Sequence, residues 1–106
     1  MWKVDKGSQT GVTTEEYVSA LDWKVAELGE KTILLKNTHS SQSLKYRLYG
    51  YVVEGDIEKN LVAETVLSAG EIAEFHYERQ WHRLVLQVAN DSGQASYQID
   101  YEGQGA

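Results

Sequence analysis

The sequence has no cysteine and no proline among its 106 residues, and positive charge is scarce. The absence of cysteine excludes disulfides and thiolate metal sites and leaves the redox compartment open. Ten Lys and Arg stand against sixteen Asp and Glu, which gives a formal net charge of −6. Nucleic acids and anionic membranes are therefore not expected as partners, because both are bound through clustered basic side chains.

Long apolar runs are also missing. No stretch approaches the ~20 apolar residues of a membrane span, and the segment from Met1 to Gly7 has no apolar core of a signal peptide. We therefore expect the chain to start in the cytoplasm. Gly-x-Ser-x-Gly, Gly-x-Gly-x-x-Gly and Walker motifs are absent, and no pair of carboxylates is singled out by its position. We expect no enzymatic activity and no cofactor.

What the sequence does contain is alternation of apolar and polar residues in short runs from Lys31 to Tyr101, separated by Gly, Asn, Asp and Ser. Alternation with period two predicts strands that are buried on one face. The predicted strands cover residues 32–37, 44–53, 61–67, 72–77, 83–89 and 95–101. A composition that is 42% hydrophobic in a chain of this length predicts one core. The fold class is therefore all-β, a single small antiparallel β-sandwich of immunoglobulin-like or jelly-roll-like type.

Residues 13–28 fit two structures. Thr13 with Glu16 matches a capping box, and apolar residues follow at helical spacing up to Gly29. The same segment places Tyr17, Leu21 and other strand-forming residues on one face of a strand. We favour one or two strands, because a sandwich whose inner faces cover each other has no place for a lone helix.

The two ends of the chain differ from its middle in amino-acid composition. Residues 1–12 are rich in Gly, Ser, Gln and Thr, with Trp2 and Val4 as isolated apolar residues, and they are expected to form a flexible N-terminal arm. The arm either folds back onto its own sheet or docks on a neighbouring subunit. The sandwich is expected over residues 13–102, followed by a polar tail over 103–106.

Two groups of residues are candidates for contact with a partner. The longest predicted strand places Leu44, Tyr46, Leu48 and Val52 inward and Lys45, Arg47, Tyr49 and Tyr51 outward. Exposed aromatic residues on a strand can anchor a protein interface or stack on sugar rings, so Arg47, Tyr49 and Tyr51 are the first choice. Arg79 and Trp81, at a predicted turn, are the second.

Metal binding is the remaining chemistry to weigh. His76, Glu78 and His82 offer imidazole and carboxylate groups that zinc accepts. Their spacing matches no known motif, and polar residues on an exposed strand face are ordinarily solvated. No metal site is therefore expected.

The segment Lys31-Thr32-Ile33-Leu34-Leu35-Lys36-Asn37-Thr38, followed by Leu44-Lys45-Tyr46-Arg47-Leu48, resembles small β-sandwich modules in virion accessory proteins of tailed phages. Leu67-Ser68-Ala69-Gly70-Glu71 and Tyr97-Gln98-Ile99-Asp100-Tyr101 share this character. The resemblance covers about two-thirds of the chain and implies a capsid decoration or tail-associated protein that binds a symmetric lattice as a trimer or other oligomer.

The function expected from the sequence is therefore that of a non-enzymatic structural or interaction module located in a virion, or otherwise in the cytoplasm. Its expected partner is protein, either a further copy of the chain or a capsid or tail lattice. The expected contact residues are Trp2, Val4, Arg47, Tyr49, Tyr51, Arg79 and Trp81. The alternative is a carbohydrate-binding module that uses Tyr49, Tyr51 or Trp81 as stacking platforms.

Overall fold

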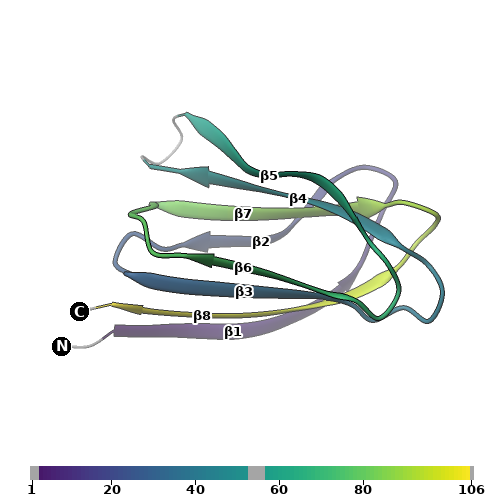
Figure 1. Cartoon of the computed structure of the whole chain (residues 1–106), viewed down its shortest axis with the longest axis horizontal. Coiled ribbons are helices and arrows are strands. Elements are labelled where there is room, and N and C mark those ends of the chain that lie inside the picture. Colours follow the sequence, from purple (N-terminus) through teal and green to yellow (C-terminus); the bar gives the residue numbers. More distant parts are fainter. Residues whose placement is uncertain (1–2, 53–56, 106) are drawn as a thin grey trace.

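The computed structural model describes residues 3–52 and 57–105 and confirms an all-β sandwich. Its strands are β1 (Lys3–Val12), β2 (Val18–Lys24), β3 (Glu30–Asn37), β4 (Leu44–Tyr51), β5 (Glu58–Leu67), β6 (Ile72–Tyr77), β7 (Arg83–Asn90) and β8 (Ser96–Gly105). They form two antiparallel sheets in the orders β1-β8-β3-β6 and β2-β7-β4-β5 (Figure 1). The described residues include no helix that could cross a membrane.

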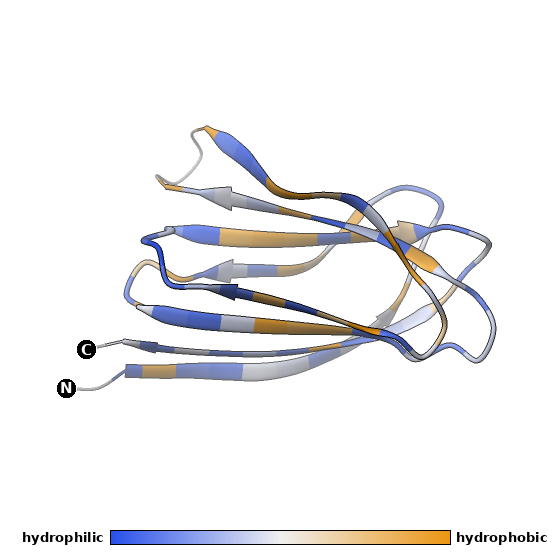
Figure 2. Ribbon diagram, viewed as in Figure 1, coloured by the Kyte–Doolittle hydropathy of each residue, from blue (hydrophilic) through white to orange (hydrophobic). Residues whose placement is uncertain are grey.

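The two sheets bury the apolar faces that the alternation predicts. Leu84, Leu86 and Val88 of β7 are buried against side chains of the opposite sheet such as Ile33 and Leu35. Figure 2 shows apolar stretches along these central strands. Burying one such side chain contributes roughly 1.5–3 kcal/mol, so the core formed by both inner faces accounts for the pairing of the sheets.

Several predicted elements are confirmed. β6 has the predicted bounds, and β2 settles the ambiguous segment in favour of a strand. Leu44, Tyr46 and Leu48 are buried as expected. The prediction for Val52 was wrong: it is exposed, because β4 ends at Tyr51 and the alternation stops there.

Residues 3–12 form a strand and not a flexible arm, and of the two alternatives for this segment the structure shows the one that folds back onto its own sheet. They form β1, an edge strand that pairs with β8 over its whole length, from Lys3 opposite Gly105 to Val12 opposite Ser96. The inner face of β1 carries glycine where a side chain would be expected. A Cβ at Gly11 would lie 2.5 Å from the hydroxyl oxygen of Tyr97, because the tyrosine ring covers this glycine from the neighbouring strand.

The expected tail over residues 103–106 is also wrong for the residues that the structure describes there. Gly103, Gln104 and Gly105 continue β8, so the sandwich runs beyond residue 102. A Cβ at Gly103 would lie 2.6 Å from Cδ1 of Leu28. The glycines therefore allow the end of β8 to pass close beneath the turn that follows β2, and the missing side chains explain why alternation did not reveal this extension.

Thr13, Asn37 and Lys31 are buried polar residues, and each forms hydrogen bonds at the connections between strands. Thr13 donates through Oγ1 to Asn90 and accepts from the backbone N–H of Ala95. The side-chain amide of Asn37 donates to the carbonyls of Gln42 and Leu67.

Lys31 lies on the inner face of β3, and its Nζ donates to the carbonyl oxygens of Leu28 (3.2 Å), Gly29 (3.0 Å) and Arg79 (2.7 Å). Burial lowers the pKa of Lys31. Leu28 and Gly29 belong to the β2–β3 turn and Arg79 belongs to the β6–β7 turn. Lys31 therefore links the two turns by donating to carbonyl oxygens of both.

Candidate functional site

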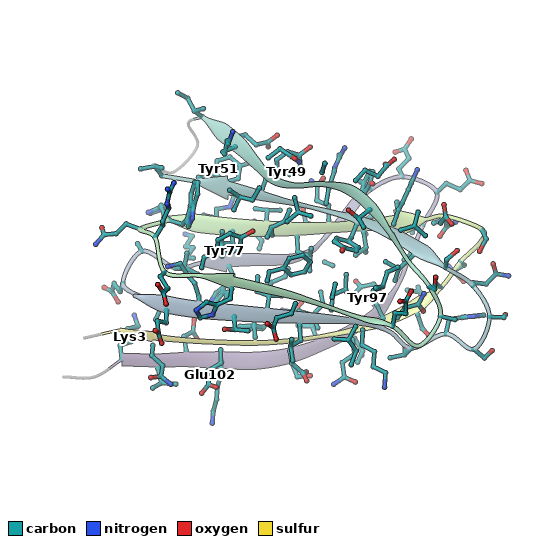
Figure 3. All side chains as sticks on the ribbon, in the orientation of Figure 1. Lys3, Tyr49, Tyr51, Tyr77, Tyr97 and Glu102 are labelled. Carbon is teal, nitrogen blue, oxygen red and sulfur yellow. The ribbon has the colours of Figure 1, made fainter. Side chains whose placement is uncertain are left out.

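The outward face of β4 brings the first group of predicted contact residues together. Arg47, Tyr49 and Tyr51 alternate along the strand and share its outer face, since residues two apart in a strand point the same way. Tyr49 and Tyr51 can be followed along β4 in Figure 3. Gln87 and Arg83 of β7 lie opposite Arg47 and Tyr51.

Guanidinium groups and tyrosine rings interleave on this surface. The Arg47 guanidinium carbon lies 3.8 Å from the centroid of the Tyr17 ring and 5.4 Å from that of Tyr49. The Arg83 guanidinium carbon lies 4.8 Å from the Tyr51 ring centroid. We call Tyr17, Arg47, Tyr49, Tyr51 and Arg83 the aromatic–arginine face. These cation–π contacts favour one arrangement of the long arginine side chains.

Hydrogen bonds hold the arginines in place. Arg47 Nε donates to Gln87 Oε1 at 2.6 Å. Arg83 donates twice to Asp22, from Nε at 2.7 Å and from the terminal nitrogen at 3.0 Å. This bidentate geometry orients the guanidinium plane.

The tyrosines are held by carboxylates of β5. Tyr17 donates to Glu64 at 2.5 Å, and Tyr51 donates to Glu58. Burial, together with the hydrogen bond to Glu64, raises the pKa of Tyr17, while that same hydrogen bond lowers the pKa of Glu64. The hydrogen bond to Glu58 raises the pKa of Tyr51. Both phenols therefore remain protonated donors at neutral pH.

Such a surface is suited to protein contact. Tyrosine and arginine dominate the energetics of protein interfaces, and residues held in position before binding lose less entropy on association. Val85 lies opposite Tyr49 on β7 and is buried although its strand position faces outward, so a buried apolar side chain lies beneath the face.

The sequence analysis missed Tyr17, because the structure of residues 13–28 was ambiguous. It also missed the pairing of Arg83 with Tyr51, because that pairing depends on strand register.

The second predicted group does not form a free loop-tip surface. Trp81 is partly buried and packs on the core, and a Cβ at Gly50 would lie 2.8 Å from its ring. Its Nε1 is buried and has no hydrogen-bond partner among residues 3–52 and 57–105. Arg79 is exposed, and its carbonyl accepts from Lys31. Trp81 therefore contributes mainly to packing at the end of the sandwich.

The predicted N-terminal contacts lie elsewhere. Val4 belongs to β1 and is exposed, on the sheet that does not contain the aromatic–arginine face. Trp2 lies outside the described residues. The predicted contact residues that the structure describes therefore lie on both sheets and on the connection between β6 and β7.

The metal candidates are only partly brought together. His76 and Glu78 meet Glu30 of β3, with one ligand atom from each lying within 4.8 Å of the others, while His82 is not part of this group. Thr32 Oγ1 lies 2.7 Å from His76 Nδ1, which leaves Nε2 facing Glu78 at 3.6 Å. All three residues are exposed, and exposed carboxylates and imidazoles are ordinarily solvated.

Comparison with known proteins gives the fold a context. No protein-family model matches the chain, and no curated protein matches its sequence. Among solved structures, it is similar to a chain of the disulfide-linked pili that form Bacillus endospore appendages, at 10% identity and a TM-score of 0.64, over 99% of this chain and 89% of that one.

It is also similar to the Yersinia pseudotuberculosis-derived mitogen, at 14% identity and a TM-score of 0.62, over 92% of this chain and 84% of that one. A third similar structure is the SPBc2 prophage-derived protein YomS, at 16% identity and a TM-score of 0.50, over 94% and 95% of the two chains. These proteins differ in kind, and one fold hosts many functions. At these identities the similarity shows that the chain has a small β-sandwich fold that recurs in assembled pili and in a prophage protein.

Proposed function

We propose that this protein is a non-enzymatic structural module that works by protein–protein contact through the aromatic–arginine face. The observation that supports this most directly is the interleaving of Arg47 with Tyr17 and Tyr49 and of Arg83 with Tyr51 on the outside of one sheet. Intramolecular hydrogen bonds already orient the side chains of Arg47, Arg83, Tyr17 and Tyr51. A partner that covers them gains contact with rigid aromatic and guanidinium groups at low entropic cost.

The specific role we propose is that of a virion accessory protein, such as a capsid decoration or tail-associated protein, that self-associates or binds a symmetric protein lattice. The sequence resemblance to phage modules and the fold shared with a prophage protein support this role. The fold shared with pili is compatible with a module that assembles. Its location would then be the virion.

Glycan binding is the competing use of the same residues. A sugar ring stacks on an open aromatic face. Here the Arg47 guanidinium lies 5.4 Å from the Tyr49 ring centroid, the Arg83 guanidinium lies over Tyr51, and Trp81 packs on the core. Protein contact therefore explains the face better than carbohydrate stacking does.

The test is the native mass of the full chain by light scattering across concentration. We expect a discrete oligomer, and the double variant Arg47→Ser/Tyr49→Ser should weaken its association at least about tenfold, as expected for interface anchors. Lys36→Ser, on an exposed position of the other sheet, is the matched control and should leave the mass unchanged. A wild-type monomer at the highest soluble concentration that binds a glycan panel would overturn the proposal.

A further inference from the structure

The four edge strands of the sandwich differ in how well they are protected from pairing with another chain. β6 has six residues. β2 and β5 at the edges of the other sheet have irregular register with their neighbours. β1 has ten residues, and its register with β8 is unbroken. Short and bulged edges resist pairing, whereas a long regular edge offers a template for another strand.

The exposed face of β1 has a symmetric pattern. Its outward residues are Val4, Lys6, Ser8, Thr10 and Val12. The valines at the two ends have 48% and 55% of their surface exposed, and Ser8 lies midway between them. The inward positions of β1 do not explain the valines, because Gly11 and its neighbours on that face contribute no apolar side chain to the core.

We propose that β1 pairs antiparallel with β1 of a second copy about a two-fold axis at Ser8. This rests on the proposed function, to which it adds a second self-association surface distinct from the aromatic–arginine face. Val4 of each copy then lies opposite Val12 of the other, and Lys6 lies opposite Thr10. Residues directly opposite in an antiparallel pair share one face, so both exposed valines gain an apolar neighbour.

The proposed dimer has closed two-fold symmetry, and the side chains that it places opposite each other are compatible. Two-fold pairing uses the same strand on both copies and joins two four-stranded sheets into one of eight strands. The free edge of β1 gains roughly eight to ten backbone hydrogen bonds. No like charges face each other, since Lys6 meets a threonine and Asp5 meets Gly11. The aromatic–arginine face belongs to the other sheet, so the dimer presents two copies of it to further partners.

The first test uses the absence of native cysteine. Opposed residues of antiparallel strands have Cα atoms about 4.5–5.5 Å apart, within the range that a disulfide spans. Ser8→Cys should therefore form a covalent dimer under mild oxidation. Residue 10 is exposed on the same strand face, but in this register it would lie about 14 Å from its counterpart, so Thr10→Cys should remain uncross-linked. Equal cross-linking of the two variants, or none of Ser8→Cys, would overturn the pairing.

The second test exchanges charge at the paired valines and is read as the dimer dissociation constant by analytical ultracentrifugation. Val4→Lys/Val12→Lys places like charges opposite each other at both ends and should weaken the dimer roughly tenfold. Val4→Lys/Val12→Glu places opposite charges there and should stay within about threefold of wild type. Equal weakening by both variants would refute this register.

The two proposals fail separately. A wild-type oligomer that resists both β1 tests but dissociates with Arg47→Ser/Tyr49→Ser would remove the β1 dimer and leave the aromatic–arginine face as the contact surface. If Ser8→Cys forms a covalent dimer but Arg47→Ser/Tyr49→Ser leaves association unchanged, the β1 dimer is supported and the aromatic–arginine face is not the contact surface.

Discussion

Substituting Gly11 by alanine tests how the N-terminal edge strand is attached to the sandwich. In the structure the Tyr97 ring of β8 lies across this glycine, and a Cβ would meet its hydroxyl oxygen at 2.5 Å and its Cζ at 2.7 Å. Tyr97 is buried, so the ring has little room to move away. An aromatic ring that covers a glycine on the neighbouring strand is a known means of holding a glycine-containing strand in a sheet.

The expected magnitude follows from two opposing effects. Overpacking a filled site costs about 1–3 kcal/mol, whereas alanine gains about 0.5–1 kcal/mol over glycine in a strand through lower entropy of the unfolded chain. We therefore expect Gly11→Ala to lower the free energy of unfolding by about 1–2 kcal/mol. For a domain of this size, a loss of 1 kcal/mol lowers Tm by several degrees.

The assay is urea unfolding monitored by tryptophan fluorescence, in a double-mutant cycle with Tyr97→Leu. Without the ring, Gly11→Ala should be neutral or stabilising, which gives a coupling free energy of about 1–3 kcal/mol. Gly29→Ala is the matched control, since its Cβ would lie 3.5 Å from the carbonyl oxygen of Gln104, an ordinary contact. The reasoning is refuted if Gly11→Ala is as stable as wild type, or costs the same with and without the Tyr97 ring.

Two further predictions concern polar groups. Tyr17→Phe removes the hydrogen bond that lowers the pKa of Glu64, so carboxyl titration by NMR should show that pKa rising toward its ordinary value, and an unchanged pKa would contradict the contact. Because the folded-state pKa is lowered, the stabilisation by this pair is present above the unfolded-state value and is lost as pH falls through the folded-state pKa. Lys31→Met removes the donor shared by three carbonyls and should lower the free energy of unfolding, measured with denaturant, by about 1–3 kcal/mol. A variant as stable as wild type at pH 7 would show that these hydrogen bonds between the turns contribute nothing to stability.

The two proposed surfaces have different consequences for assembly. Pairing through β1 is isologous and stops at a dimer. The aromatic–arginine face lies on the other sheet and remains available in that dimer. A dimer with two such faces could link neighbouring units of a lattice, which fits the role proposed for the protein.

The local pattern of residues was sufficient to predict the fold class and most of the core. Alternation predicted β6 and the inward positions of β4 and β7, because strand period and burial are local properties of the chain. It also placed Arg47, Tyr49 and Tyr51 together, since residues two apart on one strand necessarily share a face.

Contacts between residues far apart in the chain could not be predicted from local pattern. β1 was missed because glycines occupy its inner face, and the rings that cover them come from β8, about ninety residues further along the chain. Trp81, in the connection between β6 and β7, was expected at a surface, but Gly50 on β4 leaves the space into which its ring packs. Tyr17 joined the aromatic–arginine face only because the sandwich brings it against Arg47. In each case the partner is distant in sequence, so strand register and the close approach of backbones determine the contact, and neither is visible in a single run of residues.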